Sequence, residues 1–284
     1  MQRFGYVDTG RGQVHYRHAG AGPAVVLLHW GPGSSAQYAG AVDEFAARGF
    51  QAIAPDLPGF GQSLRLEGHW SIGDFAACML ECLDGWGLGR CVLVGGHLAS
   101  LIAMEAADRA PQRFALVVLD GTPAWDEARR REILQRARPV PMTPSEDGAH
   151  LQALWQQLLG QVRIWRPGLA WGEQAGRFAM QLVKARLMAG SGPQPTEALL
   201  GYDVFAALGR LRAPTLALSA DDDPLRDCHD TVLARVAGST GHVFRGDHPL
   251  HSRAGSARYV EPIVARLRAL GFVADAAGRT GGQS

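Results

Sequence analysis

The stretch VLVGGHLAS, residues 92 to 100, decides the fold of this chain. It begins as a short apolar run typical of a buried strand and passes through glycines into the helical pattern of residues 98 to 110. A sharp turn from strand to helix needs small residues on both sides of its apex, and Gly95 and Ala99 supply them. The residue at the apex is His97, so the question is what an imidazole does there.

Outward from this stretch, apolar strand-like runs alternate with longer helical patterns, which predicts an α/β protein with a parallel sheet covered by helices. The segments on either side of TGRGQ, residues 9 to 13, predict an opening hairpin. Further strands are expected at 23–30, 51–56, 90–96, 114–120, 213–220 and 242–246. Helices are expected at 35–50, 71–88, 98–110, 228–238 and 254–272, with Ser71 as an N-cap.

Residues 124–207 interrupt this alternation with a helical pattern that is rich in Trp, Leu, Gln and Arg and has no clear strand. An insertion after the carboxyl end of a strand would lie over the edge where open α/β sheets bind ligands. We interpret it as a lid on a core domain formed by residues 1–123 and 208–275, the alternative being a separate helical interaction module. Residues 276–284 are small and polar and are expected to be a flexible tail.

The composition argues against several classes of protein. A net charge of +1, with 46% hydrophobic and 19% charged residues and no Lys/Arg-rich run, gives no surface for nucleic acid. The amino-terminal segment lacks the order of a signal peptide, and no apolar stretch approaches about 20 residues, so a cytoplasmic protein without membrane contact is expected. No metal or cofactor is expected, because the cysteines lack a metal-binding pattern and suit buried thiols. They are Cys78, Cys82, Cys91 and Cys228.

Five short motifs occur in a fixed order, each after a predicted strand. They are VVLLHWGPGSS at 25–35, DLPGFGQS at 56–63, VLVGGHLAS at 92–100, PTLALSADDDPL at 214–225 and GDHPLH at 246–251. In turn they resemble the oxyanion loop, the Asp-x-Pro-Gly-x-Gly-x-Ser turn, the nucleophile elbow, the acid loop and the terminal histidine loop of the α/β-hydrolase superfamily. The resemblance covers nearly the whole chain apart from the insertion and the tail. It implies a mostly parallel central sheet with helices on both faces and a helical lid insertion.

The resemblance also implies roles for individual residues. His248 corresponds to the catalytic base of the superfamily, and Asp223 to its acid, with Asp120 at the end of the strand LVVLD as the competing acid. The order apex, acid, base along the chain agrees with the superfamily. The oxyanion hole would be formed by the backbone N–H groups of Leu98 and Gly31.

Two positions depart from the superfamily pattern. His97 replaces the serine nucleophile, and Trp30 stands where the family usually has Gly. A frame shifted by one residue puts no nucleophile at the apex, and it leaves Ser100 inside the following helix. His29 is expected to be a structural hydrogen-bonding residue beneath the oxyanion loop.

Three interpretations of the apex histidine stay open. His97 could attack an acyl group itself, with the acyl-imidazole hydrolysed by water that His248 activates. Alternatively, His97 and His248 form a coupled pair oriented by Asp223, which activates water or takes a proton from a substrate. In the third interpretation the pocket only binds a ligand.

We expect hydrolysis of a small apolar or aromatic ester, lactone or C–C bond substrate. A cofactor-free lyase or dioxygenase using a His base, or a non-catalytic ligand-binding protein, is the alternative. The substrate pocket is expected to contain Trp30, Trp125 and Trp155, and the insertion also holds Trp165 and Trp171. A small-molecule substrate is the expected partner. The oligomeric state is open, a homodimer included.

Overall fold

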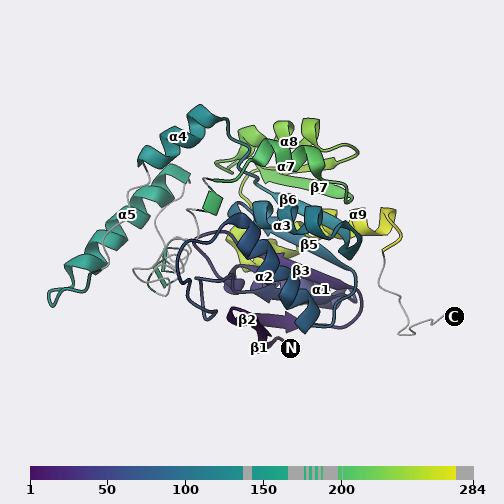
Figure 1. Ribbon diagram of the computed structural model, residues 1–284, viewed down its shortest axis with the longest axis horizontal. Coiled ribbons are helices and arrows are strands. Elements are labelled where there is room, and N and C mark those ends of the chain that lie inside the picture. The colour runs from purple at the N-terminus through teal and green to yellow at the C-terminus, as the bar shows by residue number, and fades with distance from the viewer. Residues whose placement is uncertain are drawn as a thin grey trace.

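The computed structural model describes residues 1–136, 143–165 and 201–272, together with positions 176, 179, 180, 183, 184, 187, 198 and 199. Within these residues an eight-stranded sheet has the strand order β1-β2-β4-β3-β5-β6-β7-β8, and helices cover both of its faces (Figure 1). The strands are β1 (Arg3–Thr9), β2 (Gly12–Ala19), β3 (Ala24–Leu28), β4 (Gln51–Pro55), β5 (Cys91–Gly96), β6 (Phe114–Asp120), β7 (Thr215–Ala220) and β8 (Thr240–Phe244).

The directions of the strands confirm the predicted fold class. β1 and β2 form the expected antiparallel hairpin, in which Thr9 pairs with Gly12, and β2 is also antiparallel to β4. The other neighbours, from β4 through β3, β5, β6 and β7 to β8, are all parallel. The carboxyl ends of these parallel strands therefore lie at one edge of the sheet, where α/β proteins place their sites.

Two hydrophobic clusters fill the space on either side of the sheet. Because side chains alternate along a strand, Val25 and Leu27 join one cluster while Val26 and Leu28 join the other. One face is covered by α1 (Ala39–Ala47) and α9 (Ser256–Ala269), which pack against each other. The opposite face carries α2 (Ile72–Gly85), α3 (Leu98–Arg109), α7 (Val204–Arg210) and α8 (His229–Arg235). Short 3-10 helices lie at 35–38, 111–113, 226–228, 249–251 and 253–255.

The start of α2 has the local structure that its sequence predicts. Ser71 is the N-cap, and its hydroxyl accepts a hydrogen bond from the Asp74 N–H at 3.2 Å. The Asp74 carboxylate accepts in return from the Ser71 N–H at 2.9 Å, which completes a capping box. The amino-terminal donors of α2 are thereby satisfied by the chain itself.

Two helices of the insertion are described, α4 (Glu127–Arg136) and α5 (Ala149–Trp165), and both lie to one side of the sheet and its covering helices (Figure 1). The expected end of the insertion at residue 207 falls inside α7, which begins at Val204 and packs against α3. Trp171 and the predicted tail, residues 276–284, lie outside the described residues.

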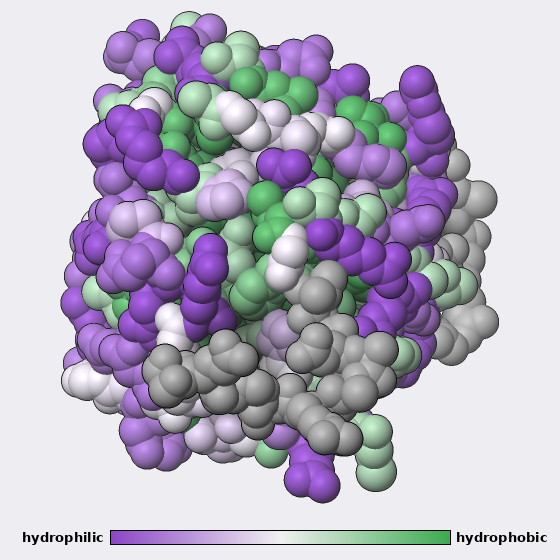
Figure 2. All heavy atoms as spheres, turned by 90° about the vertical axis from the view of Figure 1, so that its right-hand side faces the viewer, coloured by the Kyte–Doolittle hydropathy of each residue, from purple (hydrophilic) through white to green (hydrophobic). Residues whose placement is uncertain are grey.

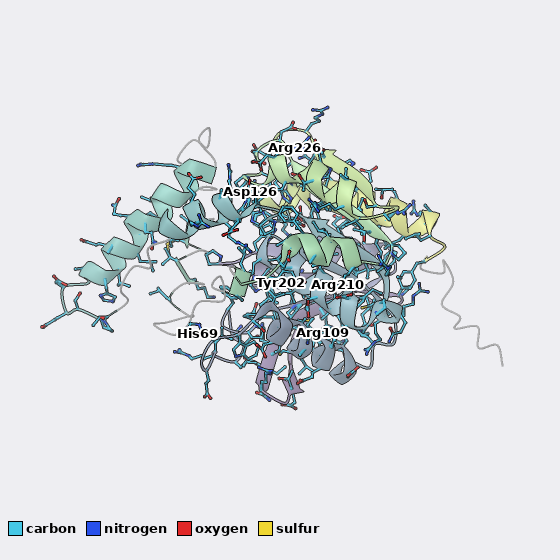
Figure 3. The ribbon with its side chains drawn as sticks, turned by 45° about the horizontal axis from the view of Figure 1, so that its top comes forward. His69, Arg109, Asp126, Tyr202, Arg210 and Arg226 are labelled. Carbon is cyan, nitrogen blue, oxygen red and sulfur yellow. The ribbon has the colours of Figure 1, made fainter. Side chains whose placement is uncertain are left out.

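The segment that returns from the insertion is fastened to α3. The Tyr202 hydroxyl donates a hydrogen bond to Glu105 at 3.0 Å, and Arg210 pairs with Asp108 at 2.7 Å. Figure 3 labels Tyr202 and Arg210 on this segment. Arg130 on α4 donates to the Tyr202 carbonyl at 3.1 Å. These contacts join α4 and the return segment to the helix that starts at the apex histidine.

The face of the molecule in Figure 2 carries both hydrophilic and apolar side chains. Hydrophilic side chains occupy most of the margin of the face in Figure 2, and apolar side chains gather toward its centre. In the part of the chain that the structure describes, no helix has both the length and the hydropathy needed to cross a membrane.

Candidate active site

The turn between β5 and α3 has the sharp geometry that its small residues predict. His97 at the apex has φ 49° and ψ −116°, and it is the only residue other than glycine with a positive φ in the described part of the chain. A side chain at Gly95 would lie 2.2 Å from the Ala99 carbonyl oxygen, so only glycine fits there. Backbone strain of this kind costs about 1–3 kcal/mol and occurs mainly at functional sites.

Four titratable side chains meet at the carboxyl edge of neighbouring strands. His97 follows β5, Asp120 ends β6, Asp223 follows β7 and His248 follows β8. The backbone connects the first two, because the His97 N–H donates to the Asp120 carbonyl at 2.8 Å. The sheet thus brings together the candidate residues that lie far apart in the sequence.

His97 pairs with Asp223. Nε2 of His97 lies 3.5 Å from Oδ2 of Asp223, with 23% of the His97 side chain exposed and Asp223 buried. Gly121, just after β6, leaves room for the pair, since a Cβ there would lie 2.6 Å from the carboxylate oxygen and 2.7 Å from the imidazole Cδ2. The second carboxylate oxygen of Asp223 accepts from the Leu225 N–H at 2.8 Å, which fixes its orientation.

His248 pairs with Asp120, the competing acid of the sequence analysis, rather than with Asp223. Nε2 of His248 lies 3.1 Å from Oδ1 of Asp120, and the Tyr259 hydroxyl from α9 donates to Oδ2 at 2.9 Å. Asp223 faces the apex instead, because the loop after β7 turns its carboxylate toward His97. Nδ1 of His248 accepts from the Leu250 N–H at 3.3 Å, so both ring nitrogens have partners in the protein.

The surroundings of the His97–Asp223 pair shift both acidities. Burial lowers the pKa of His97, but Asp223 and, more weakly, Asp120 together outweigh it, and the net pKa is raised above its ordinary value. Burial raises the pKa of Asp223, but His97, the Leu225 N–H and His248 together outweigh it, so the net pKa is lowered. Each partner therefore stabilises the charged form of the other.

Trp30 covers the His97 ring. The indole is stacked on the imidazole with centroids 4.7 Å apart and an interplanar angle of 10°, and it meets His248 edge-on at 5.0 Å. Gly96 makes room for it, because a Cβ there would lie 2.0 Å from the indole Cδ1. His29 supports the loop from below, accepting from the Leu57 N–H at 2.9 Å and pairing through Nδ1 with the Trp30 carbonyl at 2.7 Å.

Two further expected residues lie at the elbow. Leu98 is the first residue of α3, so its N–H is one of the donors that lack an acceptor within the helix. Gly31 directly follows Trp30 in the opposite loop. The Ser100 hydroxyl donates to the His97 carbonyl at 2.6 Å and is fully buried in the first turn of α3, which is a helix-start role.

The tryptophans expected in a pocket have different surroundings. Trp125 is half-buried against the hydrophobic cluster on the α2 and α3 face. Trp155 lies on α5, where it lines a hollow together with Leu151 and Gln152 of the same helix. Trp165 belongs to the end of α5, and its side chain is not among those described.

Sequence reasoning missed two residues that build the site, Tyr259 and Gly121. Tyr259 occupies an ordinary apolar position of the α9 pattern, and its pairing with Asp120 has no local signal. Gly121 follows Asp120 directly and has φ 60°, so a glycine after a strand-ending acid was the available clue.

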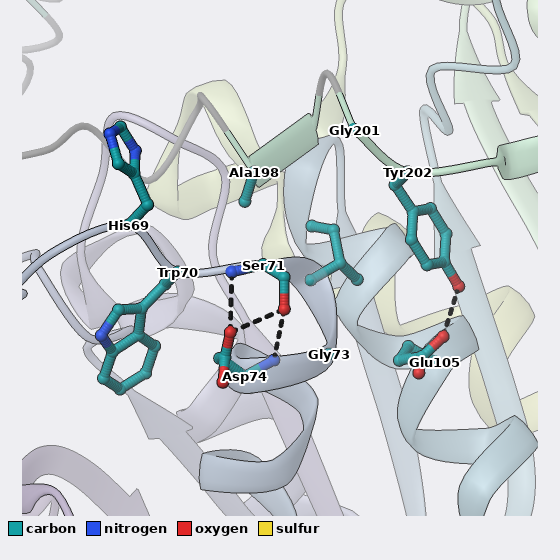
Figure 4. Close-up of a pocket in the computed structure, with 10 residues that line it drawn as sticks. His69, Trp70, Ser71, Gly73, Asp74, Glu105, Ala198, Gly201 and Tyr202 are labelled. Carbon is teal, nitrogen blue, oxygen red and sulfur yellow. Dashed lines mark hydrogen bonds between the residues drawn. The ribbon is translucent and has the colours of Figure 1, made fainter.

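A separate hollow of about 400 Å³ lies between the start of α2, α3 and the segment that returns from the insertion (Figure 4). Its polar groups are paired with one another, Ser71 with Asp74 and Tyr202 with Glu105. None of the expected catalytic residues lines it. Among the described residues, no cluster of His, Cys, Asp or Glu is suited to hold a metal ion.

With this geometry established, comparisons with known proteins give the class. The alpha/beta hydrolase fold model matches residues 23–231. The (E)-2-((N-methylformamido)methylene)succinate hydrolase of Acinetobacter baylyi is 32% identical over 225 residues, which cover 77% of this chain and 80% of that protein. The chain belongs to the α/β-hydrolase fold family.

Two more similarities differ in how much of each chain they cover. Haloalkane dehalogenase 2 of Mycobacterium tuberculosis is 34% identical over 121 residues, and this match spans 42% of each chain, less than half the length of that relative. A thermophilic esterase from Thermogutta terrifontis has a similar structure, with a TM-score of 0.72 over 94% of this chain and 99% of that one, at 20% identity. The second similarity shows the fold alone.

Proposed function

We propose that this chain is a hydrolase of small apolar or aromatic esters, lactones or C–C bond substrates, in which His97 takes over the work of the absent serine. The observation that carries the proposal is the His97–Asp223 pair, a partly exposed imidazole beside a buried carboxylate at the apex of the elbow. The match with the Acinetobacter baylyi hydrolase over most of both chains supports hydrolysis as the reaction type.

The contacts favour His97 as a general base. Asp223 faces Nε2 at 3.5 Å, and this contact favours the tautomer of neutral His97 with its proton on Nε2 and its lone pair on Nδ1. For an ester, Nδ1 takes one proton from a water molecule while the water oxygen bonds to the carbonyl carbon. The bond from that carbon to the leaving oxygen then breaks, and the proton on Nδ1 passes to the leaving oxygen, which restores neutral His97.

The N–H groups of Leu98 and Gly31 are the proposed donors to the oxyanion. Leu98 qualifies because it begins α3, where backbone donors point out of the helix. Trp30 beside the imidazole favours a flat apolar substrate over a long or highly charged one. Trp125, which packs against the core, is kept as a proposed pocket residue. Trp155 and the insertion as a lid remain part of the proposal.

His248 has a supporting role in this scheme. Its Nε2 faces Asp120 and its Nδ1 accepts from Leu250, so it has no free lone pair for a substrate in this arrangement. It contributes to the site as a neighbour of Trp30 rather than as the atom that takes the proton.

A substrate panel tests the proposal. Small aryl esters and aryl lactones are compared with long-chain esters and with highly charged esters, and product release is followed for each. We expect turnover of the small aryl substrates at least about tenfold faster in kcat/KM than of the others. Turnover of only charged or polymeric substrates would contradict the substrate class. Binding of the aryl compounds without any product would favour the ligand-binding alternative.

A further inference from the structure

We propose that Trp30 is a positioning residue that fixes the ring plane of His97, so that Nε2 stays directed at Asp223 and Nδ1 at the substrate. The inference rests on the proposed function of His97 and adds the residue that positions its ring. Its basis is the stacked contact between the indole and the imidazole, 4.7 Å between centroids at an angle of 10°.

The His97 ring lies in a slot with two walls. Trp30 stacks on one face of the imidazole. Gly121 lies against its edge, at a place where even a Cβ would come within 2.7 Å of Cδ2 and 2.9 Å of Nε2. A ring confined in this way has little freedom to rotate about the bond to its backbone.

The contact between Trp30 and His97 depends on neighbouring residues that leave room for the indole and hold its backbone. Trp30 fits only because residue 96 is glycine, since a Cβ there would be 2.0 Å from the indole. Its backbone is also held, because the Trp30 N–H donates to the Gln37 side chain at 3.0 Å and its carbonyl is bound by His29 at 2.7 Å. The backbone of Trp30 is therefore held by contacts that do not involve His97.

A fixed ring matters more for histidine than for serine. A serine hydroxyl can rotate to reach its base, whereas an imidazole presents its two nitrogens in directions set by the ring plane. If the plane of the His97 ring tilted, Nε2 would leave Asp223, and the proton would no longer be held on that nitrogen. Small misplacements of a catalytic group are known to cost about a hundredfold in rate.

The charged groups facing His97 do not give this selectivity alone. Asp223 from the loop after β7 and Asp120 at the end of β6 both favour the imidazolium, and His248 from the loop after β8 approaches the same indole. Carboxylates attract a charged ring in either orientation, while a stacked indole restricts its plane. The two effects are separable by experiment.

The test uses the full chain with Trp30→Leu, which removes the stacking, and Trp30→Phe, which keeps an aromatic face. Trp86→Phe is the matched control, because Trp86 also packs on an aromatic ring, that of Tyr16, away from the site. The readouts are the ¹⁵N NMR signals of the two His97 nitrogens in the substrate-free protein, assigned by their loss in His97→Gln, and kcat and KM for the best aryl ester.

We expect Trp30→Leu to lose the single Nε2–H tautomer signal of His97 and to lower kcat about tenfold to a hundredfold. Trp30→Phe is expected to keep the signal and most of kcat, and Trp86→Phe to match the natural protein. A Trp30→Leu protein that keeps the His97 signals unchanged would overturn the inference, whatever its activity.

The outcome is distinguishable from failure of the proposed function. If His97→Gln retains full activity, the function of His97 is wrong, but the NMR signals still report whether Trp30 orders the ring. If Trp30→Leu does not fold, the result for Trp30→Phe decides, because mixed tautomer signals in that variant would contradict a role of the aromatic face.

Discussion

Nε2 of His97 lies 3.5 Å from Oδ2 of Asp223, and this contact crosses over β6 to join the loops after β5 and β7. A second pair, His248 with Asp120 at 3.1 Å, joins the ends of β8 and β6 in the same way. The two pairs therefore interleave along the sheet edge. Because each histidine has its own carboxylate, they are expected to respond differently to substitution.

Asp223→Asn is expected to move the acidic limb of the kcat/KM profile to lower pH. His97 must be neutral to act as a base, so activity falls as the pH falls through its pKa, which Asp223 holds above its ordinary value. Without the carboxylate charge of Asp223, burial lowers the pKa of His97 and only the weaker attraction of Asp120 opposes it, so a shift of about one pH unit or more is expected. The measurement is kcat/KM from pH 5 to 9.

The matched control is Asp221→Asn, in the same acidic loop, whose carboxylate accepts from the Gly246 N–H at 3.0 Å. This variant should keep the acidic limb in place. An unchanged limb in Asp223→Asn would mean that the titrating group is not His97.

Tyr259→Phe is expected to lower the free energy of unfolding by about 1–3 kcal/mol. The hydroxyl donates to a fully buried carboxylate, and its loss leaves one oxygen of Asp120 without that donor. Burial and Asp120 raise the pKa of Tyr259 well above its ordinary value, so the donor stays protonated throughout the pH range of the experiment. Urea unfolding at pH 7 gives the difference.

Tyr6→Phe is the control, because Tyr6 is 50% exposed on the edge strand, and it should change the free energy by less than about 0.5 kcal/mol. Equal stability of Tyr259→Phe and the natural protein would contradict a stabilising role for the buried hydrogen bond.

Asp56→Asn should destabilise the fold by about 2 kcal/mol at pH 7. Asp56 is buried and accepts from the Ser35 N–H at 2.6 Å and the Gln62 N–H at 2.9 Å, with His15 at 2.9 Å. Burial raises the pKa of Asp56, but His29 and these N–H groups together lower it by more, so the net pKa lies below its ordinary value.

A depressed pKa fixes the pH dependence of this contribution. The stabilisation is fully present above the unfolded-state pKa of about 3.9 and is lost as the pH falls through the lower folded-state value. The difference between the natural protein and Asp56→Asn should therefore shrink in acid, while the exposed control Asp230→Asn shows no such trend. A constant difference down to pH 2 would rule this out.

General-base catalysis predicts that no acyl group accumulates on His97. A slowly hydrolysed aryl ester is mixed with the protein, the reaction is stopped in acid at early times, and the intact mass is measured. We expect the unmodified mass at all times, because in this scheme the water oxygen bonds directly to the carbonyl carbon. A transient acyl adduct on the peptide that contains His97 would show nucleophilic catalysis instead.

Much of the fold could be predicted from local sequence because each element carries its own signal. The apolar run before Gly95 predicts β5, and Ser71 as an N-cap predicts the start of α2. The elbow was also predictable, since the crowding at Gly95 tolerates no side chain whatever stands at the apex.

The pairing within the site could not be predicted in the same way. Asp120 ends β6 and Asp223 follows the neighbouring strand β7, so both acids reach the same edge of the sheet and their order in the chain fits either partner. The choice depends on which histidine each carboxylate points toward, and no local pattern encodes this. The stacking of Trp30 on His97 likewise joins loops more than sixty residues apart, a contact that no local pattern encodes.

The most direct test of the account is kcat/KM of the best small aryl ester for His97→Ala beside the natural protein, with the exposed His242→Ala as control. The account predicts a loss of about a thousandfold in His97→Ala and no change in His242→Ala, since a positioned base contributes about 10²–10⁴ in rate. Activity of His97→Ala within a few fold of the natural protein would show that the apex imidazole does not carry the chemistry.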